Sequence, residues 1–154
     1  MRELWRIADF GRAIRRELRF GELSRARLQL LRLEWKGDSA EYEWMARPAD
    51  EWDVDLTPRV REEHETLQAL QDAIAVRELL FSALPGVESV SLRVFRQSAT
   101  SAPDLIMTGT VTRGQEIPRN VSSTAMRAKL LGFRFWLEDG ILEALQPEEC
   151  AMSF

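Results

Sequence analysis

The chain has 154 residues, of which 45% are hydrophobic and 30% charged, and its net charge is -4. This composition fits a single folded domain and excludes wholesale disorder. It contains no apolar run of the ~18 residues that a membrane-spanning helix requires, and the start shows no apolar secretion signal. Because Cys150 is the only cysteine, an internal disulfide is excluded and we expect a protein of the reducing cytoplasm.

The first predicted element is a helix that ends before Gly21. Apolar residues recur from Leu4 to Leu18 at three- and four-residue spacing, which indicates one buried stripe. Four arginines fall largely off this stripe, namely Arg12, Arg15, Arg16 and Arg19. Residues 1–36 carry ten basic and five acidic side chains, whereas residues 37–65 carry three basic and ten acidic ones. We therefore expect these arginines to meet acidic side chains of this protein or a partner, rather than nucleic acid or lipid.

The segment "RLQLLRLEWKGDSAEYEWMAR" predicts a β-hairpin that turns at Gly37-Asp38. This turn sets a register in which one face is apolar throughout. Its predicted cross-strand pairs are Trp35 with Ala40, Leu33 with Tyr42 and Leu31 with Trp44. The other face places Arg32 opposite Glu43, a favourable charge pair, and Glu34 opposite Glu41, an unfavourable one.

An acidic loop, "RPADEWDVDLTP", leads from the hairpin into a second predicted helix. Thr57 is suited to cap this helix, and Pro58 is suited to its first position. The helix is expected to end at Pro85-Gly86. Such a helix is about 40 Å long at 1.5 Å per residue, so a bend or an early break is the alternative.

Two β-strands are predicted next, in "VESVSLRVFRQ" and "DLIMTGTVTR". A third helix follows in "RNVSSTAMRAKLLG", which has capping residues at its start and Gly132 at its end. In residues 133–146 the Asp139-Gly140 pair favours a second hairpin that joins Leu137 to Leu142 and Phe135 to Ala144, with a short helix as the alternative.

Together these elements predict one α+β domain over residues 1–154, in the order α-ββ-α-ββ-α-ββ. We expect an antiparallel sheet of four to six strands with the helices packed on one face.

The sequence offers little material for catalysis or for cofactor binding. His64 is the only histidine and lies among charged residues, and Cys150 lies beside two glutamates that disfavour a thiolate. The zinc sites that proteins commonly use need more such ligands than this chain has, and the glycines match no phosphate-binding loop. We expect no metal or cofactor, lean against an enzyme, and predict that His64 and Cys150 are dispensable.

Two features are candidates for binding. The start of the third helix joins Arg119, Ser122, Ser123 and Arg127, and free backbone N–H groups there make an anion site possible, with simple helix capping as the alternative. Trp52, in the acidic loop, is a candidate contact residue, as is Trp5. We expect a non-enzymatic module that binds a protein partner or itself, rather than nucleic acid or a membrane. The alternative is a small-molecule or anion-binding domain, which includes the case of an enzyme.

Overall fold

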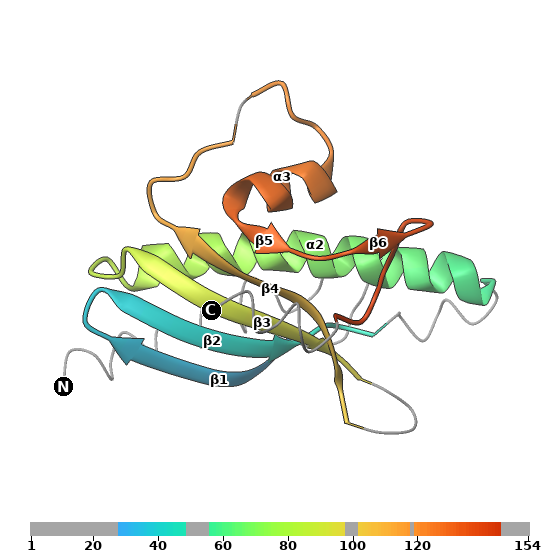
Figure 1. Cartoon of the computed structure of the whole chain (residues 1–154), viewed down its shortest axis with the longest axis horizontal. Helices are drawn as coiled ribbons and strands as arrows, with labels where there is room; N and C mark the ends of the chain where they lie inside the picture. Colours follow the sequence, from blue (N-terminus) through green and yellow to red (C-terminus); the bar gives the residue numbers. More distant parts are fainter. Residues whose placement is uncertain (1–27, 49–55, 98–101, 118, 146–154) are drawn as a thin grey trace.

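A five-stranded sheet and two helices form the α+β domain seen in a computed structural model, which describes residues 28–48, 56–97, 102–117 and 119–145 (Figure 1). The strands of the sheet follow one another in chain order from β1 to β5. The elements are β1 (Gln29–Lys36), β2 (Ser39–Met45), α2 (Pro58–Ala83), β3 (Ser89–Arg96), β4 (Asp104–Thr112), α3 (Thr124–Leu131), β5 (Phe133–Arg134), β6 (Leu137–Glu138) and β7 (Ile141–Leu142). In Figure 1, α2 lies behind the sheet, and α3 packs against α2. Neither helix is long and apolar enough to cross a membrane.

The α+β class is confirmed, but the predicted element order and sheet type are wrong. The described order is ββ-α-ββ-α-βββ, and the predicted N-terminal helix lies outside the described residues. The sheet is mixed rather than antiparallel, because β2 and β3 pair in parallel while the other neighbouring strands pair antiparallel. The reason is the connection between them: α2 carries the chain back along the sheet before β3 begins, and a strand-helix-strand connection of this kind produces parallel strands.

The hairpin of β1 and β2 has the predicted register over most of its length. The pairs Trp35 with Ala40, Leu33 with Tyr42, Arg32 with Glu43 and Glu34 with Glu41 are all confirmed. The pair of Leu31 with Trp44 is wrong, because a β-bulge between Leu30 and Arg32 places Leu30 opposite Trp44. The extra residue in the bulge is Leu31, whose 42% exposure shows that it leaves the core face.

The core lies between α2 and the alternating inward side chains of the sheet. Ala40, Tyr42 and Trp44 of β2 are buried, and so are the predicted inward residues Val90, Leu92 and Val94 of β3. The rings of Tyr42 and Trp44 stack at 4.9 Å between centroids, with 10° between their planes. This parallel contact of two fully buried aromatic rings fills the centre of the core.

Helix α2 begins and ends at the predicted signals and runs without a break for 26 residues. At its start, Thr57 Oγ1 accepts a hydrogen bond from the Val60 N–H at 3.3 Å, as expected of an N-cap. At its end, the guanidinium of Arg113 donates to the carbonyl oxygens of Phe81, Leu84 and Val87 at 2.7–2.9 Å. Arg113 thereby supplies a donor to the Phe81 carbonyl, one of those that a helix end leaves without an intrahelical partner, and links the end of α2 to the turn that follows.

A buried ion pair joins α2 to the chain that follows β2. Arg47 Nε lies 2.9 Å from Asp72 Oδ2, and both side chains are almost fully buried. Gln68 Nε2 also donates to Asp72 Oδ1 at 2.9 Å. Burial raises the pKa of Asp72 to about 6, although Arg47 and Gln68 act to lower it. Burial likewise lowers the pKa of Arg47, so both members of the pair bear a desolvation cost.

The end of α3 explains a short strand that the sequence did not predict. Gly132 follows α3 with φ of +110°, and a Cβ atom there would collide with the Thr110 carbonyl of β4. This close approach lets β5 pair with β4 at once, with Phe133 opposite Gly109. The predicted hairpin at Asp139-Gly140 is confirmed, with Leu137 opposite Leu142, but it forms a separate two-stranded sheet. The predicted pair of Phe135 with Ala144 is wrong, because β6 and β7 are only two residues long and neither residue belongs to them.

Candidate functional site

The residues proposed as an anion site are placed around the start of α3. Ser123 is the N-cap, and its Oγ accepts a hydrogen bond from the Met126 N–H at 3.3 Å. Arg119, Ser122 and Arg127 are exposed. The capping role of Ser123 is therefore confirmed, and anion binding there stays a prediction. Trp52 lies outside the described residues.

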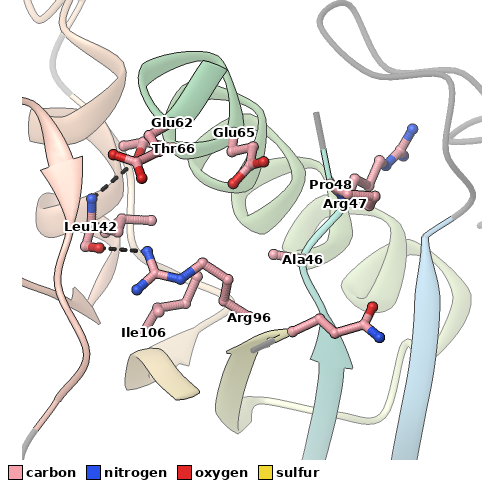
Figure 2. Close-up of a pocket in the computed structure, with 10 residues that line it drawn as sticks. Ala46, Arg47, Pro48, Glu62, Glu65, Thr66, Arg96, Ile106 and Leu142 are labelled. Carbon is pink, nitrogen blue, oxygen red and sulfur yellow. Dashed lines mark hydrogen bonds between the residues drawn. The ribbon is translucent and has the colours of Figure 1, made fainter. Parts of the chain in front are cut away.

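The structure contains a cleft elsewhere, between the first half of α2, the end of β3 and β7 (Figure 2). Its inner cavity has a volume of about 100 Å³, and the apolar groups of Ala46, Ile106 and Leu142 form part of its lining. Polar and charged side chains, among them Glu65 and Arg96, form the rest. Its outer part, of about 460 Å³, opens between Pro58 of α2 and Ile141 of β7. We call the two together the α2–β7 cleft. It contains none of the residues that the sequence singled out for binding.

Hydrogen bonds to the backbone of Leu142 fix the walls of the α2–β7 cleft, as the dashed lines in Figure 2 show. The Leu142 N–H donates to Thr66 Oγ1 of α2 at 3.0 Å. The Leu142 carbonyl oxygen accepts from the Arg96 guanidinium of β3 at 2.7 Å, and the other end of this guanidinium lies 3.9 Å from Asp104. Arg96 therefore joins β3, β4 and β7 at the base of the cleft.

Charged side chains of both signs surround the mouth of the cleft. Glu62 and Glu65 line it from α2, and their spacing of three residues places them on one face of the helix. Glu143 lines it from the chain after β7, and Arg61 and Arg96 supply the positive charges.

Burial and orientation determine which charged side chains present their charge to the cleft. The Arg61 Nε–H is buried and has no hydrogen-bond acceptor in the part of the chain that the structure describes. In Figure 2, Glu65 and Arg96 face the cavity from opposite walls, whereas the Arg47 guanidinium points away from Arg96 and pairs with Asp72. Arg47 therefore contributes only the base of its side chain to the lining.

The candidates for catalysis and metal binding are not gathered in the cleft. His64 is half-buried on α2 but lines neither part of it, and Cys150 lies outside the described residues. Among residues 28–48, 56–97, 102–117 and 119–145, no group of three or more histidine, cysteine and acidic side chains is arranged to hold a metal ion. The side chains that line the cleft carry guanidinium, carboxylate, amide, hydroxyl and apolar groups.

A second feature is the exposure of large apolar side chains after α3. Trp136 is 59% exposed, the highest value among the exposed large apolar residues of the described chain, and its neighbour Leu137 is 38% exposed. Phe133 and Phe135 are buried while Arg134 and Trp136 are exposed, so the side chains alternate between core and solvent. This alternation is visible in the sequence "FRFW" and would have indicated that Trp136 faces solvent once either phenylalanine was placed inside.

Comparison of the chain with protein-family models, curated proteins and solved structures finds no match.

Proposed function

We propose that this domain is a protein-interaction module, binding a partner or a second copy of itself through a surface that includes Trp136. The observation that carries the proposal is the 59% exposure of this tryptophan in a folded segment. An exposed indole ring removes a large apolar area from water when it enters a partner's pocket, which is why tryptophan is enriched among the residues that dominate binding energy.

The backbone around Trp136 supports this proposal, because neighbouring contacts hold that backbone in place. Phe135, immediately before it, is buried, and the Trp136 carbonyl accepts a hydrogen bond from the Glu143 N–H at 2.9 Å. Leu137, the next residue, is also exposed, at 38%. A side chain on fixed backbone loses less conformational freedom on binding than one on a mobile loop.

Sedimentation velocity over a range of concentrations tests the self-association arm of the proposal. We expect the wild type to show a concentration-dependent increase in mass that Trp136→Ala removes and Arg127→Ala, an exposed control on α3, retains. Binding of a different protein is tested by photo-crosslinking. A photo-crosslinking amino acid replaces Glu138, which is exposed and lies two residues after Trp136, and in a control protein it replaces the exposed Glu41 of β2.

A protein captured only at Glu138 is then purified and its affinity measured. Trp136→Ala should weaken it by about 30-fold, since loss of an interface hot spot costs about 2 kcal/mol. The proposal is wrong if both experiments fail. In the first, self-association is absent or is unaffected by Trp136→Ala; in the second, no crosslink at Glu138 depends on Trp136.

A further inference from the structure

The α2–β7 cleft carries a second inference, which is independent of the interaction surface at Trp136. Its two parts differ in their separate linings. Ala46 and Ile106 line only the inner cavity, whereas Arg61 and Glu143 line only the mouth. Glu62, Glu65 and Arg96 line both parts and therefore lie where the two meet. The inner volume of about 100 Å³ corresponds to roughly three water molecules at their share of liquid volume. It therefore suits a small branched alkyl group rather than a ring system.

The arginine side chains at the mouth favour a ligand with an anionic hydrogen-bond acceptor. Arg61 lines the mouth, and its buried Nε–H has no acceptor in the described part of the chain. A buried donor without an acceptor destabilises the protein, and a ligand that supplies an acceptor removes that cost. Guanidinium groups match carboxylates well, because the two planar groups pair through parallel hydrogen bonds.

The glutamate side chains at the mouth favour a ligand that also carries a cationic group next to its carboxylate. Glu62 and Glu65 of α2 and Glu143 after β7 line the mouth, and Glu62 and Glu143 are exposed. A ligand that carried only a carboxylate would face these negative charges with no positive group of its own. A ligand that carried a carboxylate and an ammonium group on neighbouring atoms would satisfy both signs of charge in one pose.

We propose that the α2–β7 cleft binds a free α-amino acid with a small apolar side chain. The carboxylate of the ligand pairs with Arg61, its ammonium group lies between Glu62 and Glu143, and its alkyl group enters the inner cavity. Arg96 acts as a positioning residue, because its hydrogen bond to the Leu142 carbonyl holds β7 as one wall of the cleft.

The first test uses the wild-type protein and needs no substitution. L-valine is titrated at up to millimolar concentration while backbone amide signals are followed by NMR. We expect saturable shifts at cleft residues such as Thr66, Gln97 and Leu142. Valinamide lacks the carboxylate and N-acetylvaline lacks the ammonium group, so each should bind about tenfold more weakly, the loss expected for one charge-assisted hydrogen bond.

The second test uses variants with matched controls on the same helix. Arg61→Gln and Glu62→Gln should each weaken valine binding by about tenfold. Arg59→Gln and Glu63→Gln remove an exposed ion pair that lies outside the lining, and should leave binding unchanged. Trp136→Ala should also leave it unchanged, which separates this proposal from that of an interaction surface.

Three results would overturn the proposal. They are the absence of saturable valine binding to the folded wild type, equal binding of valine and its two blocked forms, and equal effects of the cleft variants and their controls. Circular dichroism of each variant confirms that a loss of binding does not reflect a loss of fold.

Discussion

Arg113 provides the most direct test of how this fold is held together. It lies just after β4, yet it makes four hydrogen bonds to three carbonyl groups at the end of α2 and in the turn that follows. Its guanidinium carbon also lies 4.9 Å from the centre of the Phe81 ring. The substitution Arg113→Met keeps an apolar stem and removes these interactions together.

The expected loss follows from the geometry. A hydrogen bond from a charged donor is worth about 1.5–3 kcal/mol in a buried setting, and a cation at a helix C-terminus adds about 0.3–1 kcal/mol. Arg113 is about one-third exposed, so solvent weakens each contribution and its four bonds do not add fully. We expect Arg113→Met to reduce the free energy of unfolding by about 2–3 kcal/mol.

Urea denaturation measures this loss directly, and Arg127→Met on the exposed face of α3 serves as the control, with an expected change within about 0.5 kcal/mol. Arg113→Lys separates the two physical causes, because lysine keeps the charge but lacks the planar fork. If the fork geometry dominates, the lysine variant loses nearly as much stability as the methionine variant. A change below about 0.5 kcal/mol in Arg113→Met would refute the assigned role of Arg113.

Three further substitutions test the core, the close approach of α3 to β4, and the buried ion pair. Trp44→Ala should reduce the free energy of unfolding by about 3–5 kcal/mol, because Trp44 is fully buried; an unchanged melting temperature would contradict this. Gly132→Ala should reduce the free energy of unfolding, measured by urea denaturation, by at least about 2 kcal/mol, because φ is positive and a Cβ would meet the Thr110 carbonyl. The control Gly86→Ala, with open space around it, should change the free energy of unfolding by less than about 1 kcal/mol. Burial raises the pKa of Asp72 to about 6 from 3.8, so the folded chain holds this proton more tightly and the stability contributed by Asp72 falls as pH rises from about 4 to about 6. Wild type should lose stability relative to Asp72→Asn across that range, and a difference that does not vary with pH would show that the pKa is not raised.

The local elements could be predicted from the sequence because their signals lie within a few residues. Gly37-Asp38 and the alternating side chains around it determine the first hairpin, and Thr57-Pro58 determine the start of α2. The bulge at Leu31 was missed because an added residue in one strand leaves no mark in the alternation of its neighbours. The parallel pairing of β2 with β3 was missed because it depends on where α2 returns the chain, which no local pattern encodes.

The candidate site was harder to predict, because it is built from segments far apart in the chain. Glu62 and Thr66 share a helix face, and helical spacing could have grouped them. Arg96 and Leu142 join them only through hydrogen bonds that cross 46 and 76 positions of sequence. Nothing in the sequence near Leu142 indicates that its backbone receives a guanidinium on one side and a hydroxyl on the other.

Buried polar residues of α2 make contacts that its pattern of apolar residues does not predict. Thr66, Asp72 and Arg77 are buried on this helix, and each contacts a different neighbour: Thr66 bonds to β7, Asp72 pairs with Arg47 after β2, and Arg77 donates to the Thr112 carbonyl at the end of β4. Apolar packing accepts small shifts of one surface over another, whereas a hydrogen bond weakens steeply with distance and angle. These polar contacts therefore determine where β7 and the ends of β2 and β4 lie relative to α2. The α2–β7 cleft keeps its shape because Thr66 and Arg96 both form hydrogen bonds to the backbone of Leu142.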